Sequence, residues 1–241
     1  MRDKILEVND ICKQYDNTIV VNNVSFCIYP GEIVGLIGAN GAGKSTLLKM
    51  ISHLVIPNKG NIYVKGYSIN EQYEKALGKM GINFFEGMLI NSLSAYQNIC
   101  LRVNALGLGK NRKMIVQKVI DEFDMADYAN KKCEDYSLGM KQRTALALAC
   151  VGSPDLLLLD EPMNGLDPLG IKSTRAWIKR MSKDGVATIV SSHLLYDIER
   201  LSDRLLIMSR GKLLADMKVV DILKKYESIE DFYFETTEGT L

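Results

Sequence analysis

One stretch limits the fold of this chain more than any other: residues 38–46 read Gly-Ala-Asn-Gly-Ala-Gly-Lys-Ser-Thr. A short apolar run, Ile33 to Ile37, precedes it, and an apolar pattern typical of a helix follows it. This order predicts a buried strand, a glycine-rich loop and a helix that begins near Lys44. In such a loop the backbone N–H groups and the positive end of the helix dipole bind polyphosphate, while Lys44 can reach the β- and γ-phosphates and the Ser45 hydroxyl can ligate Mg²⁺. The alternative is an ordinary glycine turn, which the patterns on both sides disfavour.

The size and charge of the chain exclude several classes of protein. Its 241 residues suit one large α/β domain or two small ones. Lysine plus arginine number 30 against 29 acidic residues, so no basic bias favours nucleic acid as a partner. No apolar run approaches the roughly 20 residues of a membrane span, and the N-terminus lacks the apolar core of a signal peptide. We therefore expect a cytoplasmic protein, one that can sit on a membrane partner.

The five cysteines are odd in number and are never spaced Cys-x-x-Cys. This arrangement disfavours both a disulfide framework and a zinc site. We expect reduced cysteines that are mostly buried.

The apolar pattern predicts alternating strands and helices with one helical stretch in the middle. Strands are expected within 4–29 and at 33–37, 62–64, 81–85, 156–159, 186–190, 205–208 and 211–216. Helices are expected from Lys44 to near Pro57, at 140–150 with Ser137 as N-cap, at 169–181 and at 219–226. The helical stretch runs from 89 to about 151, and one of its helices shows a single apolar face made by Met114, Ile115, Val119, Ile120 and Phe123. Because no repeat or linker is visible, we read residues 1–241 as one domain with a helical insertion at about 87–151.

Polar residues with catalytic chemistry follow two of the expected buried strands. Asp160 and Glu161 come after four leucines, where Asp160 can hold Mg²⁺ and Glu161 can act as general base on water. The alternative for this pair is a helix-capping role. His193 follows the next strand and can hydrogen-bond a γ-phosphate, although a lone histidine is more often structural, as we read His53. Tyr15 lies in a turn, where packing on its own hairpin is the alternative to a binding role.

Six motifs in one order make the chain similar to a known family. Tyr15, the 38–46 loop, Ser-Leu-Gly-Met-Lys-Gln-Arg, Leu-Leu-Leu-Leu-Asp-Glu-Pro, Asn-Gly-Leu-Asp-Pro and Ser-Ser-His together resemble the ATP-binding subunit of an ABC transporter over nearly the whole chain. The resemblance implies an α/β P-loop ABC-type nucleotide-binding domain with an antiparallel β subdomain and an inserted helical subdomain. It also implies that ATP and Mg²⁺ are the ligands.

The same resemblance implies a role for each matching residue. ATP-binding positions are Tyr15, which stacks on adenine, with Gly38, Asn40, Gly41, Ala42, Gly43, Lys44, Ser45 and Thr46. Asp160 belongs to the Walker B strand and Glu161 is the catalytic base, and His193 is also counted among the catalytic residues. Ser137 and Gly139 contact the γ-phosphate of ATP held by a second subunit, and Asp167 lies in the loop that crosses between the two subunits. Two ATP molecules are then sandwiched in an ATP-dependent homodimer.

The sequence departs from the commonest family pattern in two places, and the second one favours a particular subfamily. The signature has Leu138 and Met140 where glycine and glutamine are usual, which affects the rate at most modestly. Glu86 stands where a glutamine usually touches Mg²⁺ and the attacking water, and a glutamate here resembles the bacterial subfamily that expels lantibiotics and related peptide antibiotics, including bacitracin-resistance types. A carboxylate at this place adds negative charge near ATP and Glu161 unless Mg²⁺ offsets it. The alternative for Glu86 is a solvated surface acid.

These observations predict the ATPase subunit of a bacterial ABC exporter that gives immunity or resistance to a peptide antibiotic. The expected partners are a separate transmembrane permease, on whose cytoplasmic side the chain sits, and a second ATP-binding subunit. We expect the peptide to contact the permease rather than this chain. The alternatives are the ATPase of another kind of ABC exporter, a soluble ABC ATPase acting on ribosomes or DNA, and a nucleotide sensor that does not hydrolyse ATP.

Overall fold

A six-stranded sheet forms the centre of the protein in its computed structural model, which describes residues 3–84 and 88–238. Its strand order is β10-β9-β3-β8-β7-β6, and all neighbours are parallel except β10, which pairs antiparallel with β9. The strands are β3 (Ile33–Ile37), β6 (Met80–Phe84), β7 (Leu156–Asp160), β8 (Ala187–Ser191), β9 (Arg204–Ser209) and β10 (Lys212–Lys218). Because parallel strands point the same way, the segments after β3, β7 and β8 meet at one edge.

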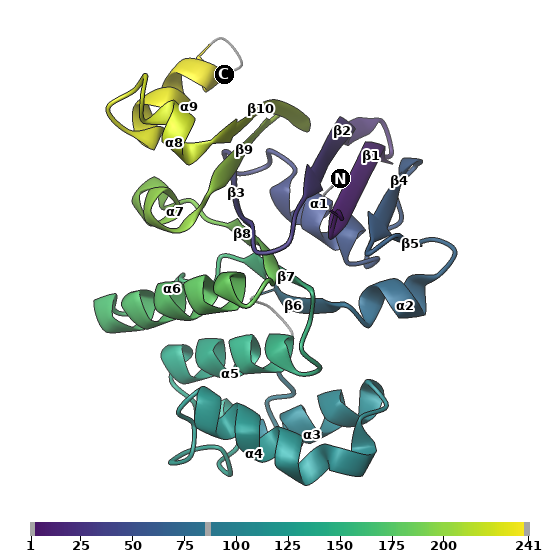
Figure 1. Ribbon diagram of the computed structural model, residues 1–241, viewed down its shortest axis with the longest axis vertical. Helices are drawn as coiled ribbons and strands as arrows, with labels where there is room; N and C mark the ends of the chain where they lie inside the picture. Colours follow the sequence, from purple (N-terminus) through teal and green to yellow (C-terminus); the bar gives the residue numbers. More distant parts are fainter. Residues whose placement is uncertain (1–2, 85–87, 239–241) are drawn as a thin grey trace.

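A second, antiparallel sheet packs beside the first (Figure 1). Its order is β2-β1-β4-β5, made by β1 (Leu6–Tyr15), β2 (Thr18–Ile28), β4 (Lys59–Val64) and β5 (Tyr67–Ser68). Val24, Phe26 and Ile28 alternate on the buried face of β2, as the sequence pattern predicts. The predicted α/β architecture with an antiparallel sheet is therefore confirmed.

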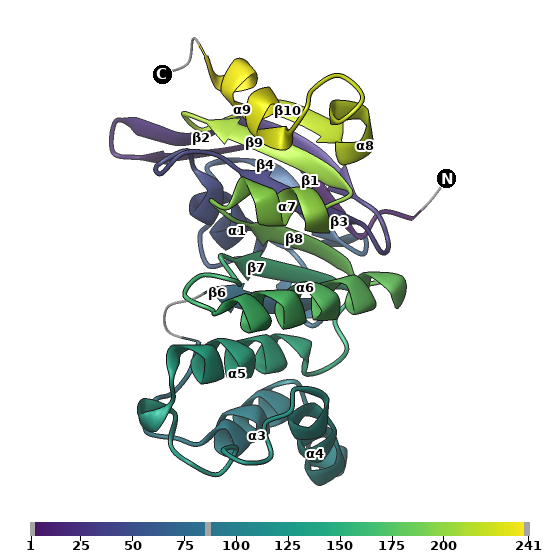
Figure 2. The same ribbon diagram turned by 90° about the vertical axis from the view of Figure 1, so that its left-hand side faces the viewer.

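Helices pack on the central sheet, and some of them form one end of the molecule (Figures 1 and 2). They are α1 (Lys44–Ile51), α2 (Tyr73–Leu77), α3 (Ala95–Ala105), α4 (Arg112–Glu122), α5 (Leu138–Cys150), α6 (Pro168–Lys183), α7 (Leu195–Leu201), α8 (Val219–Ile222) and α9 (Ile229–Thr237). Short 3-10 turns lie at Gly109–Asn111 and Cys133–Asp135. The helices α3, α4 and α5 follow one another between β6 and β7, and α3 and α4 lie farthest from the antiparallel sheet in both views.

The leucines of β7 show how the central sheet makes two cores. Leu156 and Leu158 pack on one face, with α1 and the antiparallel sheet. Leu157 and Leu159 pack on the other face, with residues of α3 to α7. All four side chains are fully buried. A strand buried on both faces cannot show polar alternation, which explains the unbroken leucine run before Asp160.

Two expectations about helices in the first two thirds of the chain are wrong. The helix after the glycine loop ends at Ile51, not near Pro57, because His53 adopts a left-handed backbone (φ +60°) that reverses the chain. On α4, Met114 is 67% exposed, whereas its near neighbour Val116 is fully buried beside Val119. The apolar face of this helix is therefore rotated toward Val116.

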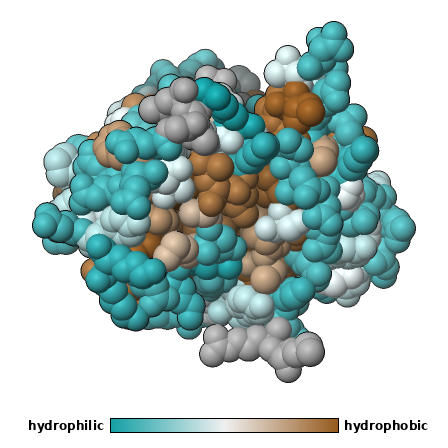
Figure 3. All heavy atoms as spheres, turned by 90° about the horizontal axis from the view of Figure 1, so that it is seen from above, coloured by the Kyte–Doolittle hydropathy of each residue, from teal (hydrophilic) through white to brown (hydrophobic). Residues whose placement is uncertain are grey.

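The C-terminal part also differs from the expectation of one helix at 219–226. The helix α8 ends at Ile222, and Ser228 starts the separate helix α9 by accepting a hydrogen bond from the Asp231 N–H at 3.1 Å. Both helices lie beside β10, at the end of the molecule from which Figure 3 is viewed. On that face apolar side chains gather in the middle, among hydrophilic ones (Figure 3).

The cysteines are free, as expected, but they are not mostly buried. Cys133 is buried, and the other four are half-buried. Burial raises the pKa of both the Cys133 and Cys150 thiols above the ordinary value. These two thiols are therefore held in the unreactive, protonated form.

Candidate active site

The glycine loop lies between β3 and α1 and is packed so closely that side chains are excluded from parts of it. A Cβ atom at Gly38 would lie 2.3 Å from the Met208 carbonyl oxygen, and one at Gly43 would lie 2.5 Å from that of Val20. Gly43 is also the N-cap of α1 in a left-handed conformation, with φ +104°. The loop thus needs glycine to fold, and it leaves the first N–H groups of α1 directed out of the helix.

Lys44, the first residue of α1, folds its side chain back over the loop. Its ammonium donates hydrogen bonds to the carbonyl oxygens of Gly38 at 2.6 Å and Ala39 at 3.1 Å. Burial lowers the pKa of the Lys44 amine, while the negative charges of Glu161 and Asp160 act in the opposite direction. A cation in this position, close to two acids, is suited to bind a phosphate group.

The carboxylates of Asp160 and Glu161 lie at the end of β7, and a neighbouring serine orients both residues. Asp160 pairs with Ser191 across the parallel strands, and the Ser191 hydroxyl donates a hydrogen bond of 2.5 Å to the Asp160 carboxylate. The Glu161 N–H donates to the same hydroxyl at 3.0 Å. Glu161 has a left-handed backbone with φ +50°, which is uncommon for a residue with a side chain and is concentrated at functional sites.

His193 contacts the carboxylate that the sequence predicts as general base. Its Nδ1 lies 2.9 Å from Glu161 Oε2, at the end of β8. The His193 side chain is 54% exposed and that of Glu161 is 24% exposed, so both can be reached by a ligand above the loop. In contrast, His53 stacks on Tyr73 with a ring separation of 5.9 Å, which agrees with the structural role expected for it.

The remaining residues predicted to bind ATP lie on or near the glycine loop, and their roles stay predictions. Tyr15 ends β1, is 46% exposed and has the Lys13 ammonium 5.0 Å from the centre of its ring. Asn40 and Gly41 are exposed at the tip of the loop, and Ala42 is buried beneath it. The other two positions, Ser45 and Thr46, lie in the first turn of α1, where Ser45 is exposed and Thr46 half-buried.

The oxygen donors at this edge of the sheet fit Mg²⁺ better than a transition metal. The Ser45 hydroxyl and the Asp160 carboxylate are hard oxygen ligands, and Mg²⁺ commonly takes one or two such protein ligands together with water and substrate phosphates. Within residues 3–84 and 88–238, no group of three or more histidine, cysteine or acidic side chains could hold a metal ion. The donor set therefore suits a metal bound jointly with a nucleotide. Glu86, predicted as a further metal and catalytic residue, lies outside the described residues.

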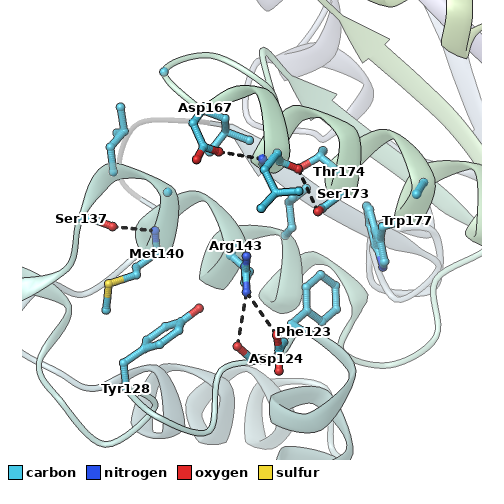
Figure 4. A pocket seen from close by; sticks show the side chains of 18 of the residues that line it. Phe123, Asp124, Tyr128, Ser137, Met140, Arg143, Asp167, Ser173, Thr174 and Trp177 are labelled. Atoms are coloured by element: carbon cyan, nitrogen blue, oxygen red, sulfur yellow. Dashed lines mark hydrogen bonds and ion pairs between the residues drawn. The ribbon is translucent and has the colours of Figure 1, made fainter.

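Ser137, Gly139 and Asp167 lie apart from this site and line a separate pocket (Figure 4). The Ser137 hydroxyl caps α5 by accepting a hydrogen bond from the Met140 N–H at 3.3 Å. The Asp167 carboxylate caps α6 and accepts from the Gly170 N–H at 2.7 Å. Of the described residues that line this pocket, none belongs to the glycine loop. The chain thus does not bring its own signature residues to its own glycine loop.

Two residues support the site although the sequence alone assigns neither of them a role, and both lie within the quoted motifs. Ser191, the first residue of Ser-Ser-His, connects Asp160 to Glu161. Gln142 is 2% exposed and donates a 2.7 Å hydrogen bond to the Pro162 carbonyl oxygen. This bond joins α5 directly to the turn after Glu161.

Comparison with known proteins agrees with the resemblance in the sequence. The family described as ABC transporter matches residues 21–164. The bacitracin transport ATP-binding protein BcrA of Enterococcus faecalis is 34% identical over 229 residues, which cover 95% of this chain and 74% of that protein. The lantibiotic transport ATP-binding protein SrtF of Streptococcus pyogenes is 33% identical over 227 residues, which cover 94% of this chain and 93% of that protein.

A solved structure of the ATP-binding subunit of an ABC transporter matches the fold with a TM-score of 0.88. It is 30% identical in sequence, and the match covers 97% of this chain and 99% of that chain. The predicted ABC-type P-loop fold is thereby confirmed. None of the helices in the described part of the chain combines the length and the apolar character needed to cross a bilayer.

Proposed function

This chain belongs to the ABC transporter family as an ATP-binding subunit, and from this premise we propose that it hydrolyses ATP to drive a separate permease that expels a peptide antibiotic. Cassettes of the family are ATPases in general and act as dimers with transmembrane partners. The antibiotic substrate and the roles of individual residues form the proposal. Membrane association through the permease is part of it.

One observation carries the enzymatic part of the proposal: the ends of β3, β7 and β8 bring Lys44, Glu161 and His193 to one edge of the sheet. Lys44 supplies a cation for the β- and γ-phosphates. Its ammonium now donates to the carbonyl oxygens of Gly38 and Ala39. The phosphate oxygens of ATP are stronger acceptors than carbonyl groups and would replace them.

Glu161 is positioned to remove a proton from the attacking water. In the step we propose, the water oxygen bonds to the γ-phosphorus, the bond to the bridging oxygen of ADP breaks, and Glu161 takes the proton from the water. The contact with His193 Nδ1 holds one Glu161 oxygen in place and leaves the other free for water. With both ring nitrogens protonated, His193 would donate from Nδ1 to Glu161 and from Nε2 to the γ-phosphate. A bound Mg²⁺, held by Ser45 and Asp160, would neutralise charge on the phosphates.

Ser137 and Gly139 complete the site only when they come from a second copy. Their separation from the glycine loop within one chain supports this. Both residues lie at the start of α5, and the N-terminus of a helix suits an anion. We therefore assign them to the γ-phosphate of the partner's ATP, and we place Asp167 in the crossing between subunits. In this homodimer, ATP binding closes the two copies and hydrolysis reopens them.

The peptide-antibiotic substrate rests on the relatives and on Glu86. BcrA is named for bacitracin transport and SrtF for lantibiotic transport. A glutamate at position 86, where glutamine is usual, is similar to what that subfamily has. We propose that Glu86 contacts Mg²⁺ and couples the nucleotide state to the permease. The permease then contacts the surface from Glu86 to Tyr96, and the peptide contacts the permease.

The proposal is tested by purifying tagged Glu161→Gln protein from native membranes with MgATP present and identifying the proteins that accompany it. Glu161→Gln is chosen because it should bind MgATP and stay closed. A small polytopic permease, whose deletion together with this chain sensitises cells to a lantibiotic or bacitracin, would support the proposal. Ribosomal or DNA-repair proteins without a membrane subunit would overturn it in favour of a soluble ABC ATPase.

A further inference from the structure

A pocket of about 950 Å³ lies between α5, α6 and the C-terminal end of α4 (Figure 4). Ser137, Gly139 and Asp167 form one rim of it. The body of the pocket is lined by other residues, to which the proposed ATPase cycle gives no role, and one of them, Arg143, is the last residue of the Ser-Leu-Gly-Met-Lys-Gln-Arg motif. A space of this size is typical of sites that bind small organic molecules.

One end of the pocket is apolar and aromatic. The Phe123 and Trp177 rings lie 5.3 Å apart and are tilted by 52°, and both side chains are less than a tenth exposed. Leu146, which is 3% exposed, also lines the pocket. This surface is suited to the ring or branched aliphatic group of a ligand.

Two polar atoms on residues of the pocket are buried: Nε1 of Trp177 and the hydroxyl oxygen of Tyr128. Within the described residues Trp177 Nε1 has no hydrogen-bond partner, whereas the Tyr128 hydroxyl has the Thr144 side chain beside it. In Figure 4 the Tyr128 hydroxyl points into the space below Arg143. Burial raises the pKa of Tyr128, so its hydroxyl keeps its proton at neutral pH and remains a donor. A buried donor without a partner, as at Trp177 Nε1, is uncommon.

Arg143 adds a cation with spare hydrogen-bonding capacity. Its Nη1 lies 3.4 Å from the Asp124 carbonyl oxygen and 3.9 Å from the Asp124 carboxylate, which is 98% exposed. These contacts are long and leave most of the five guanidinium donors unused. Two further acids line the pocket: Glu122 is already paired with Arg180 at 2.9 Å, and the Asp167 carboxylate on the rim accepts a hydrogen bond from the Gly170 N–H. An anion entering the pocket would therefore meet Arg143 without displacing a strong ion pair.

We propose that this pocket binds a small amphipathic anion, distinct from ATP, whose apolar group packs on Phe123, Leu146 and Trp177. Its carboxylate or sulfonate group pairs with the Arg143 guanidinium and accepts a hydrogen bond from the Tyr128 hydroxyl. No described residue of the glycine loop lines the pocket, so binding requires no nucleotide.

The chain offers a direct reporter, because Trp177 is its one tryptophan. The probe is 8-anilinonaphthalene-1-sulfonate, an aromatic sulfonate that accepts energy from excited tryptophan. It is titrated into the nucleotide-free full chain while Trp177 emission and energy transfer are recorded. We expect saturable quenching with one probe per chain. The uncharged counterpart, N-phenyl-1-naphthylamine, serves as the second probe and isolates the contribution of the sulfonate.

Arg143→Gln should lower the affinity for the sulfonate probe by about tenfold or more, since the charge-assisted hydrogen bond is lost. Its affinity for the uncharged probe should stay within about twofold of the wild-type value. Tyr128→Phe keeps the ring, and it should lower the affinity for the sulfonate probe by less than Arg143→Gln does. Arg112→Gln, an exposed arginine at the start of α4 outside the pocket, is the matched control and should bind like the wild type. All variants are first shown to unfold at comparable temperatures.

Three results would overturn the proposal. The first is the absence of saturable Trp177 quenching. The second is equal binding of the sulfonate probe by Arg143→Gln and Arg112→Gln in folded protein, and the third is an equal loss of both probes in Arg143→Gln. If Arg143→Gln does not fold, unchanged sulfonate binding by Tyr128→Phe contradicts the proposal. Because the assay contains no ATP, its failure leaves the proposed ATPase function untouched.

Discussion

Replacing Gly139 with alanine separates a requirement of folding from a requirement of ATP turnover. Gly139 is the second residue of α5 and has no positive φ. A Cβ atom added there would meet one atom within 4 Å, Leu166 Cδ2 at 3.8 Å, which is an ordinary van der Waals distance. Alanine is favoured over glycine in a helix by up to about 1 kcal/mol. We therefore expect the free energy of unfolding of Gly139→Ala to equal or exceed that of the wild type.

The same methyl group should impair hydrolysis. In the proposed dimer the backbone at Gly139 approaches the γ-phosphate of the partner's ATP, and the methyl would occupy part of that space. A loss of about 1.4 kcal/mol or more of transition-state stabilisation corresponds to a tenfold or greater fall in turnover. The assay is phosphate release against MgATP concentration, with urea unfolding of the same preparation as the measure of stability.

Gly109→Ala is the matched control, because Gly109 also has no positive φ and its added Cβ would lie 3.5 Å from Asn104 Oδ1, remote from the site. We expect it to turn over ATP like the wild type. If Gly139→Ala is as active as Gly109→Ala, the approach of a phosphate to Gly139 is refuted. A stable but slow Gly139→Ala supports it.

Three further variants test other parts of the account. Burial lowers the pKa of Lys44 below its ordinary 10.5, so between that lowered pKa and pH 10.5 the unfolded chain binds more protons than the folded one and stability rises with pH. Lys44→Met should remove that rise in thermal unfolding experiments and abolish ATP binding without destabilising the nucleotide-free protein. Arg204 is 13% exposed and lies 3.0 Å from Glu32 and 3.1 Å from Asp216. Its replacement by alanine leaves both acids without this cationic partner. Arg204→Ala should therefore lower the urea-measured free energy of unfolding by about 3 kcal/mol. Glu86→Gln should keep ATP affinity and change either turnover or protection of cells against the peptide, and no change in either would refute the coupling role.

Local sequence patterns predict the buried strand β7 and the glycine loop, because interactions between residues close in sequence largely determine these two features. The four leucines before Asp160 predict a strand buried on both faces, and β7 is such a strand. The glycines after Ile37 predict a tight loop, and packing against the Met208 carbonyl group now explains why Gly38 cannot carry a side chain. The sequence predicts which residue types are needed there, and the structure adds their neighbours.

Features that depend on tertiary contacts could not be predicted in the same way. The role of Ser191 depends on the parallel register that sets it opposite Asp160, which no local pattern encodes. The burial of Val116 in place of Met114 depends on how α4 is rotated against α3 and α5, since the apolar spacing fits either residue. The helix α1 ends early because of the left-handed His53, a conformation that histidine adopts only in a small minority of cases.

Whether this chain hydrolyses ATP with Glu161 as general base is decided by the steady-state rate of phosphate release from the purified wild type and from Glu161→Gln, with binding of MgATP measured on both. Glutamine keeps the size of the side chain but cannot accept the proton from water. The account predicts that the wild type hydrolyses ATP, and that Glu161→Gln binds MgATP, dimerises and releases phosphate at a rate lower by about a hundredfold or more. An unchanged rate in Glu161→Gln would remove Glu161 from the role of general base and contradict the account.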